Sequence, residues 1–335
     1  METLRSGTQW FRIDSATASG SVRRASTRLA AKLGFDEIRV AEAGIVASEA
    51  ASNVWQHGRE GVVAVQVALR PSGPGLQVVA IDNGPGMADI PFSTSDGQST
   101  AGTLGVGLGA IARLSSSLDV SSNPGLGTVL VADIWPRPDE PAAVDIGALT
   151  RPIEGEDQCG DVVGARESEG HQVVMLADGL GHGPLAADSA LEALTVFHET
   201  TSTDPVAVLT AMHGRLSHTR GAAIAVASID PYFERMAFAG IGNVSTFVHD
   251  GDKRHVALSY PGIVGHDTAR LRRADLAFGR GSLLIMHSDG VRETWNLQST
   301  PGLLRRSSTV IAASILRDAG NRPDDASILV LRGRR

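Results

Sequence analysis

The first part of the chain opens with two segments in which apolar and small residues are interrupted by regularly spaced polar ones. Residues 19–33 and 36–57 are each predicted to form a helix. Asp36 is a suitable N-cap for the second helix, and Gly34 and Gly58 stand where helices commonly end. The chain is therefore expected to begin with two consecutive helices.

Strand-like apolar runs follow these helices. VVAVQVALR and LQVVAIDNG are joined by the turn PSGPG, and LDVSSN and TVLVADIWP are joined by PGLG, so two hairpins are predicted. Between the hairpins lies a loop at residues 91–105 that is rich in glycine, serine and threonine, followed by a short helix that ends near Leu114. Helices followed by an antiparallel meander predict a two-layer α/β sandwich.

The composition changes after this sandwich. The segment PRPDEPAAVD holds three prolines and three acidic residues without periodicity, which is typical of a stiff, extended linker. We therefore predict a first domain at residues 1–135, a linker at 136–146 and a second domain at 147–335.

The second domain is predicted to be rich in strands. Helices are predicted at residues 184–200, 204–217 and 302–319. Short apolar runs bounded by turns are predicted to be strands: HQVVMLADG, GAAIAVASID, RMAFAGIG, STFVHD, GSLLIMHSDG and ASILVLRG. This arrangement predicts an α/β fold in which sheets are faced by helices.

Length and composition limit the class of protein. A chain of 335 residues exceeds what one hydrophobic core commonly serves, and its net charge of −7 argues against a nucleic-acid binder. The longest apolar runs are too short to span a membrane, and no secretory signal is evident. Cys159 is the single cysteine and cannot form an internal disulfide. We expect a cytoplasmic protein without a nucleic-acid or membrane partner.

Polar residues recur every fourth position along the second predicted helix. Glu49, Asn53 and His57 share one face of that helix at this spacing. Such a stripe is either a solvated or capping face, or a site that handles a charged ligand and a metal. Downstream, Asp82 ends an apolar strand and is followed by Gly84 and Gly86, where a carboxylate can accept a hydrogen bond from an exocyclic amine while glycines let a flat ring approach the backbone.

A glycine-rich segment then leads into the short helix. Its exposed backbone N–H groups and the helix dipole suit phosphates, and its interleaved apolar residues distinguish it from a plain linker. It has no Walker P-loop pattern. The glycines concerned are Gly102, Gly105, Gly107 and Gly109.

The order E-x-x-x-N, D-x-G-x-G, G-x-x-G-x-G-L-G and G-x-G-T resembles the GHKL ATP-binding fold, and more narrowly the RsbT-type anti-sigma-factor serine kinases. DGQSTAGTLGVGLGAIARL is the most telling stretch. The resemblance implies that Asn53 holds Mg²⁺ against the ATP phosphates, that Asp82 reads the adenine amino group with Thr128 nearby, and that Glu49 is the general base toward a serine hydroxyl. The segment 93–109 would be the lid. The other nucleotide-binding residues that it implies are Gly84, Gly86, Gly102, Gly105, Gly107, Leu108 and Gly109. His57 is interpreted as structural.

The second domain carries acidic residues at strand ends. Asp161, Asp178 and Asp289 lie beside strand-like runs, as does the pair Asp324 and Asp325. A single such acid is usually a turn former, but several oxygen ligands that converge from different strands suit Mg²⁺ or Mn²⁺. Two such ions could activate a water molecule for attack on a phosphate ester. No zinc spacing is evident, and the cysteine lacks the C-x5-R loop of a thiol phosphatase.

The motifs G-D, A-D-G-x-G-H-G, S-D-G and D-D-x-[ST] resemble the SpoIIE family of PPM-type serine/threonine phosphatases, and within it the RsbX-like members. The resemblance implies an αββα sandwich with two Mn²⁺ or Mg²⁺ ions. Asp161 and Asp178 would bridge the ions and act in catalysis, and Gly179 would give its carbonyl oxygen. Asp289 and either Asp324 or Asp325, with Asp324 favoured, would complete the site. His182 either protonates the leaving serine or shapes its turn.

These features predict a fusion of a partner-switching serine/threonine kinase with a phosphatase that removes the same modification. The implied substrate is a STAS-domain protein of the anti-sigma-antagonist or RsbS-like type, and a further phosphatase or a sigma-factor pathway protein is an additional partner class. One alternative is a phosphatase whose ATP-binding domain only senses nucleotide or binds a partner. Another is a stressosome-type structural partner that activates a separate phosphatase by contact.

Overall fold

The computed structural model describes residues 7–68, 73–88, 90, 104–136, 145–230, 232–251, 253–267, 271–320 and 323–333. By its internal contacts the chain divides into two compact units. One combines the chain from Leu4 to Pro141 with the segment Asn296–Arg317, and we call it the amino unit. The other is formed mainly by Ala142–Trp295 and Asp318–Arg335, and we call it the carboxy unit.

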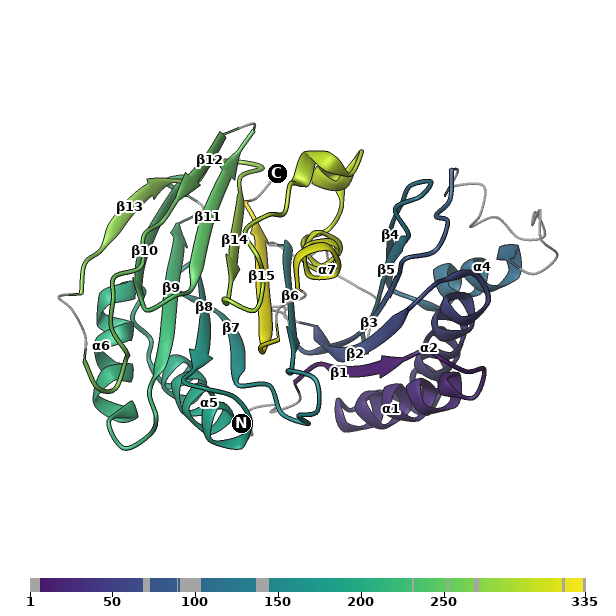
Figure 1. The fold of residues 1–335 in the computed structure, drawn as a ribbon, viewed down its shortest axis with the longest axis horizontal. Helices are drawn as coiled ribbons and strands as arrows, with labels where there is room; N and C mark the ends of the chain where they lie inside the picture. Colours follow the sequence, from purple (N-terminus) through teal and green to yellow (C-terminus); the bar gives the residue numbers. More distant parts are fainter. Residues whose placement is uncertain are drawn as a thin grey trace. The chain divides into compact units, whose positions relative to one another are not determined.

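The amino unit is a two-layer sandwich (Figure 1). Its sheet has the antiparallel order β1-β2-β3-β5-β4. The strands are β1 (Gln9–Arg12), β2 (Val62–Ala68), β3 (Gly75–Asp82), β4 (Ser117–Ser122) and β5 (Thr128–Ile134), and the helices on one face are α1 (Ala18–Lys32), α2 (Glu37–His57) and α4 (Leu104–Leu114). Alternate residues of the strands, such as Leu76 and Val78, pack with the helices in one buried core. The two-layer prediction is confirmed.

The ends of the first two helices follow from local chemistry. The Asp36 carboxylate accepts a hydrogen bond from the backbone N–H of Arg39 and caps α2. Gly34 follows α1 with a positive φ of 78°, a conformation that favours glycine. Gly58 follows α2 in an extended conformation, and it is glycine for a different reason: a Cβ there would lie 2.6 Å from the carbonyl oxygen of Val54.

The other face of this sheet carries a row of hydrogen-bonded polar side chains. Thr8 donates to Gln66, Gln66 donates to Gln77, and Gln77 donates to Asp133, at 2.6–2.7 Å. Gln66 and Gln77 face each other across the pairing of β2 and β3, as Gln77 and Asp133 do across β3 and β5. The row therefore crosses the sheet at right angles to its strands.

The segment Asn296–Arg317 contacts this second face. It contains the 3-10 turns η1 (Leu297–Ser299) and η2 (Leu303–Arg305), and most of helix α7 (Ser308–Ala319). Gln77 donates to the Thr309 hydroxyl at 3.2 Å, and Asp119 accepts from the backbone N–H of Ser307 at 2.6 Å and pairs with Arg306 at 3.3 Å. The sequence pattern predicts a helix from residue 302, whereas the α-helix starts at Ser308 after the η2 turn.

The carboxy unit consists of two five-stranded antiparallel sheets. One has the order β13-β10-β9-β8-β7 and the other β12-β11-β14-β15-β6. The strands are β6 (Asp145–Arg151), β7 (Asp161–Ser168), β8 (His171–Gly179), β9 (Ala222–Asp230), β10 (Arg235–Ile241), β11 (Ser245–Asp250), β12 (Lys253–Val256), β13 (Ala274–Ala277), β14 (Leu283–His287) and β15 (Ala326–Arg332). Residues from both sheets, including Leu176, Phe238 and Met286, form one buried core.

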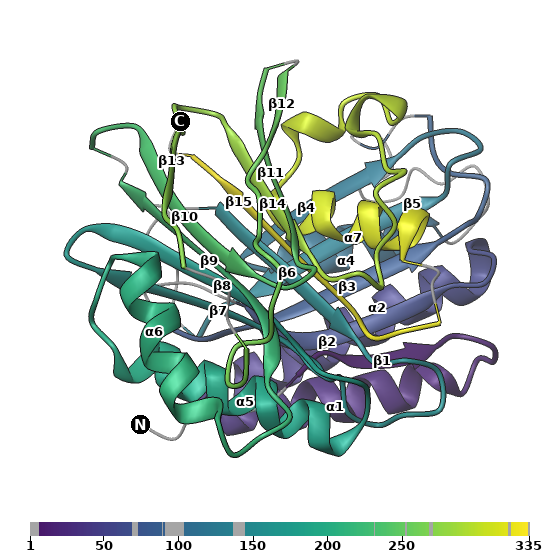
Figure 2. The ribbon, with the colours of Figure 1, turned by 60° about the vertical axis from the view of Figure 1, so that its left-hand side comes forward.

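Two helices cover the outer face of the first sheet. α5 (Pro184–Glu199) and α6 (Pro205–Leu216) lie beside β8 and β9 in both views (Figures 1 and 2). Phe197, Leu209 and Met212 pack there against Met175 and Val226 in a second buried core. The prediction of sheets faced by helices is confirmed. The segments β1, β6, β7, β12 and β13 are not anticipated by the sequence pattern, because each is short or partly exposed and lacks a long apolar run.

None of the helices in the described parts of the chain is long and apolar enough to cross a membrane.

Candidate functional site

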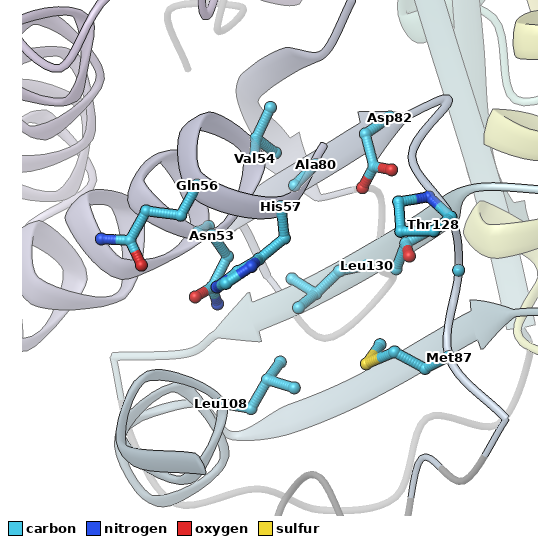
Figure 3. Close-up of a pocket in the computed structure, with 13 residues that line it drawn as sticks. Asn53, Val54, Gln56, His57, Ala80, Asp82, Met87, Leu108, Thr128 and Leu130 are labelled. Carbon is cyan, nitrogen blue, oxygen red and sulfur yellow. The ribbon is translucent and has the colours of Figure 1, made fainter. Parts of the chain in front are cut away.

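The amino unit contains a cavity of about 310 Å³ between α2, β3, β5 and the start of α4. Figure 3 shows Asn53 and His57 on α2 directed toward it, with Asp82 and Thr128 at its other end. The lining residues are Ala50, Asn53, Val54, Gln56, His57, Ala80, Asp82, Pro85, Gly86, Met87, Leu108, Thr128 and Leu130. An apolar cavity with a few polar groups at its ends suits a flat, mainly apolar ring.

Asp82 is fixed at the end of β3. Its Oδ1 accepts a hydrogen bond from the backbone N–H of Gly84 at 2.7 Å. In the pairing of β3 with β5, Asp82 lies opposite Thr128. Burial raises the pKa of Asp82, while backbone hydrogen bonds and the charge of Arg317 act against this shift. The hydroxyls of Thr128 and Ser122 are hydrogen-bonded to each other at 2.9 Å, and this contact fixes the position of both side chains. A carboxylate held by backbone donors therefore lies at the wall of the cavity, where its remaining lone pairs can accept from a ligand.

Glu49 and Asn53 converge on α4. A Cβ added to Gly107 would lie 3.0 Å from Asn53 Oδ1 and 3.0 Å from Glu49 Oε2. The absence of a side chain at Gly107 thus lets α4 approach Glu49 and Asn53, which lie one turn apart on α2. Asn53 Nδ2 is buried and has no hydrogen-bond partner among the described residues. An unsatisfied buried amide of this kind is costly and suggests that a ligand completes its contacts.

His57 is the third member of the stripe. Burial lowers the pKa of His57, and Asp82 partly opposes this shift, so the ring is neutral at pH 7. Its Nε2 is buried and has no partner among the described residues. His57 lines the cavity, and its interpretation as structural remains a prediction.

The glycines predicted to bind nucleotide occupy different places. Gly86 has a φ of 71° and its Cβ would collide with the carbonyl oxygen of Asn123, while a Cβ at Gly84 would lie 2.6 Å from the carbonyl oxygen of His57. Both glycines therefore permit close backbone packing around the cavity. Gly107 and Gly109 lie in α4 with Leu108, which is 4% exposed, and Gly105 is in the first turn of α4. Gly102 and most of the lid segment lie outside the described residues.

In the carboxy unit, Asp161 and Asp178 face each other across β7 and β8. Asp161 is 3% exposed, and its Oδ2 has no hydrogen-bond partner among the described residues. Burial raises the pKa of both carboxyl groups, and neighbouring aspartates raise them further. A buried carboxylate beside a half-buried one is unfavourable without a compensating cation. The pair therefore fits a divalent cation.

The other predicted ligands lie around this pair. Asp289 and Asp325 act electrostatically on Asp161, and Asp289 and Asp324 act on Asp178. Asp289 Oδ2 accepts from Asn243 at 2.8 Å, and Asp325 accepts from the backbone N–H groups of Ile153 and Gly160 at 2.8 Å. Over the described residues, no three acidic, histidine or cysteine side chains are arranged as a ready metal site. Asp289, Asp325 and also Asp324, whose Oδ1 accepts from the backbone N–H of Asp325 at 2.9 Å, instead have other donors as partners.

Glycines beside the acidic residues allow the loops to meet. A Cβ at Gly179 would collide with the carbonyl oxygen of Ala186, and one at Gly290 would collide with that of Asp325. A Cβ at Gly160 would lie 2.7 Å from Asp325 Oδ2. The G-D and D-G patterns in the sequence therefore reflect close packing around the acidic cluster.

Two neighbours of the cluster bear on its chemistry. Burial and adjacent aspartates raise the pKa of the Cys159 thiol, so it is not a nucleophilic thiolate. This agrees with the exclusion of a thiol phosphatase. His182 is largely exposed and its Nδ1 lies 3.2 Å from Glu156 Oε1, which leaves both of its predicted roles open.

Some residues of these sites carry no signal in the sequence. Gln56, Met87 and Leu130 line the cavity, and each looks like an ordinary helix, turn or strand residue. Ser288 lies beside Asp161, and its hydroxyl accepts from the backbone N–H of Ser327 at 2.9 Å. The S-D-G motif does mark its position, although only the aspartate is selected by the sequence argument.

Comparison with known proteins places a known domain on each part of the chain. Residues 13–133 match the model of the histidine kinase-like ATPase domain, and residues 168–334 match that of stage II sporulation protein E (SpoIIE). The serine/threonine-protein kinase RsbT of Bacillus subtilis (strain 168) is 32% identical over 117 residues, which are 35% of this chain and 88% of RsbT.

The phosphoserine phosphatase RsbX of the same organism is 22% identical over 180 residues, 53% of this chain and 88% of RsbX. A crystal structure of RsbX in complex with magnesium matches with a TM-score of 0.52 and 21% identity, over 58% of this chain and 97% of that one, which establishes the fold alone. A structure described under the bacterial stressosome, a system adapted to control secondary messenger signaling, matches with a TM-score of 0.53 and 30% identity, over 56% of this chain and 99% of that one.

Proposed function

This chain belongs to the RsbT-like family of histidine kinase-like ATPases and also carries a SpoIIE-type phosphatase domain, and we propose that it both adds and removes phosphate on serine or threonine of one regulatory protein. The observation that carries the kinase half is the convergence of Glu49 and Asn53 on Gly107, beside the cavity that Asp82 closes. A protein that only binds nucleotide has no use for a carboxylate at that place.

In the kinase half, Asp82 accepts the hydrogen bond of the adenine amino group, and the apolar wall from Leu108 to Leu130 encloses the ring. Asn53 holds Mg²⁺ against the phosphates, with Gly105, Gly107 and the start of α4 supplying backbone N–H groups. Glu49 accepts the proton of the incoming hydroxyl as its oxygen attacks the γ-phosphoryl group, the bond from the γ-phosphorus to the bridging oxygen breaks, and ADP leaves. The position of Glu49 next to Asn53 supports this assignment.

In the phosphatase half, Asp161, Asp178, Asp289, Asp324 and the carbonyl oxygen of Gly179 would hold two Mg²⁺ or Mn²⁺ ions. When bound, such ions lower the pKa of a water molecule and neutralise phosphate charge. The unpartnered Asp161 oxygen and the raised pKa of its pair support this assignment. Asp325 is bound by two backbone N–H groups, which favours Asp324 as the ligand and gives Asp325 the role of fixing the loops.

The proposed substrate is a STAS-domain protein, in keeping with the RsbT and RsbX relatives and with the stressosome neighbour. Full simultaneous activity of both halves would consume ATP without changing the substrate. We therefore expect a partner, a ligand or the ATP level to favour one half at a time, unless the halves act on different phosphorylated sites.

The test incubates the full chain, Mg²⁺, γ-labelled ATP and a purified STAS-domain protein. Asp178→Asn should raise the label on the substrate, because removal is blocked, and Glu49→Gln in the same background should abolish it. A STAS protein whose acceptor serine is replaced by alanine is the control. Absence of label with Asp178→Asn, in a chain that still binds ATP, would assign the amino unit to nucleotide sensing or partner binding instead.

A further inference from the structure

We propose that Arg220 binds the phosphoryl group of the substrate at the phosphatase site, an assignment that rests on the proposed phosphatase function. The ligand that Arg220 would bind is the dianion of a phosphate monoester, such as phosphoserine or phosphothreonine. Arg220 belongs to none of the motifs that marked the acidic cluster. It precedes β9 and follows the second of the two helices that cover the sheet.

The strand register places Arg220 at the same edge of the sheet as the acidic pair. Asp178 pairs with Ala223, and Gly179 pairs with Ala222. The next contact in this series is the hydrogen bond from Leu180 N–H to the Gly221 carbonyl oxygen at 3.1 Å. Arg220 is therefore the next residue along, opposite the turn that follows Asp178.

The guanidinium lies against that turn. Gly181 has a φ of 92°, and a Cβ added to it would lie 3.2 Å from Arg220 Nη1. Any side chain at position 181 would be strained and would press on the guanidinium. The turn between Asp178 and α5 thus provides a bare backbone surface on which Arg220 rests.

The charge of Arg220 is not used within the described parts of the chain. No ion pair or hydrogen bond to its side chain is found among the described residues, and the residue is exposed. Arg215 on α6, by contrast, pairs with Glu192 and Glu199. His182, on the other side of the turn, already contacts Glu156. The Arg220 guanidinium, next to the turn that follows Asp178, is therefore available to bind an anionic ligand.

A guanidinium is well matched to this ligand. Its planar donors form paired, charge-assisted hydrogen bonds with phosphate oxygens, and it keeps its charge at any physiological pH. Arg220 would bind and orient the phosphate, while the acidic cluster supplies the chemistry.

The test compares the full chain with Arg220→Ala, Arg220→Lys and the control Arg235→Ala. Arg235 is also exposed, and it begins β10 at the opposite end of the same sheet. Hydrolysis of p-nitrophenyl phosphate and of a phosphoserine peptide is measured with Mn²⁺. For Arg220→Ala we expect KM to rise roughly tenfold, about the loss of one charge-assisted contact, with kcat changed far less. Arg220→Lys should restore part of the loss, and Arg235→Ala should leave KM unchanged.

A second readout does not depend on turnover. Calorimetric titration of the Mn²⁺-loaded chain with inorganic phosphate should show affinity about tenfold weaker for Arg220→Ala than for the wild type or Arg235→Ala. Equal phosphate affinity in all four proteins overturns the assignment, whatever the kinetics. If the wild type binds phosphate through Arg220 but hydrolyses neither substrate, the proposed phosphatase function fails while the binding assignment stands.

Discussion

The side chain amide of Gln77 on β3 donates a hydrogen bond of 3.2 Å to the hydroxyl of Thr309, which lies 232 residues further along the chain. Thr309 belongs to the region that matches SpoIIE, whereas Gln77 belongs to the ATPase domain. The segment Asn296–Arg317 therefore packs as part of the amino unit although it lies in the phosphatase part of the sequence. The ATPase sheet depends on it for partners on one face.

A fragment of residues 1–135 should consequently be unstable or prone to associate. It would expose Val79 and Val131, which lie on the same face as Gln77 and are buried in the whole chain. Fusing residues 296–317 to its end through a glycine-serine linker should raise the melting temperature and reduce binding of an apolar dye. Asp119→Ala in the fused version is the control, because it removes contacts to Ser307 and Arg306 and should reverse part of the gain.

Within the full chain, Gln77→Leu should lower the free energy of unfolding of the amino unit by about 1–3 kcal/mol. The substitution leaves the buried side chain of Gln66 without its acceptor and removes a donor to Asp133. Arg28→Leu on the exposed surface of α1, away from the cavity, is the control and should change stability by less than about 0.5 kcal/mol. The stability of each variant is measured by denaturant unfolding, with hydrogen exchange of the backbone amides in β2 and β3 as the probe. Equal effects of the two substitutions would contradict a structural role for the polar row.

Adenosine binding should weaken as the pH falls, and should begin to do so above the range in which an exposed aspartate titrates. Burial raises the pKa of Asp82, and the deprotonated carboxylate is the stronger acceptor for an amino group. Affinity is therefore complete above the raised pKa and declines as pH is lowered through it. Adenosine is preferred to ATP because it carries no phosphate that titrates in this window. Affinity in Asp82→Asn should be weak and nearly independent of pH, and a flat profile in the wild type would exclude Asp82 from the contact.

Much of the fold follows from the periodicity of the sequence. The helices at 18–32 and 37–57, the hairpin strands and the strand that contains Asp178 are all predicted within a few residues of their observed bounds. These elements pair long apolar patterns with clear stop signals such as Gly34. The edge strands β12 and β13 are missed because they are mostly exposed, so no apolar alternation marks them.

The contacts of residues 296–317 could not be predicted in the same way. A buried helix such as α7 is apolar on most of its surface, and its pattern does not reveal which sheet it will contact. Gln77 and Gln66 likewise look like exposed strand positions in sequence, yet both are buried in a polar row. For the sites, the aspartates are recognisable from motifs, whereas Arg220 is placed by strand register and by the turn at Gly181.

When metal ions have been removed from the protein with a chelator, Asp178→Asn should raise the melting temperature of the carboxy unit by several degrees. It relieves the repulsion between the half-buried Asp178 carboxylate and the buried Asp161 carboxylate, which is worth about 1 kcal/mol or more. Added Mn²⁺ should then stabilise the wild type but not the variant. The control is Asp188→Asn, on the exposed surface of α5. An equal response of both variants to Mn²⁺ would contradict a metal at Asp178.

Glu49→Gln and Asn53→Ala should separate chemistry from nucleotide binding. Both side chains lie at Gly107, but they are assigned different tasks. Glu49→Gln keeps the shape of the side chain and removes only the base, so ATP affinity should hold while phosphoryl transfer falls by about 10²–10⁴. Asn53→Ala should weaken binding of Mg²⁺–ATP without changing that of adenosine, since the adenine end of the cavity is intact. Isothermal titration with each ligand and single-turnover transfer measure the two effects. Loss of adenosine binding in either variant would show that the stripe on α2 supports the cavity itself, and the base and the metal ligand would have to be sought elsewhere.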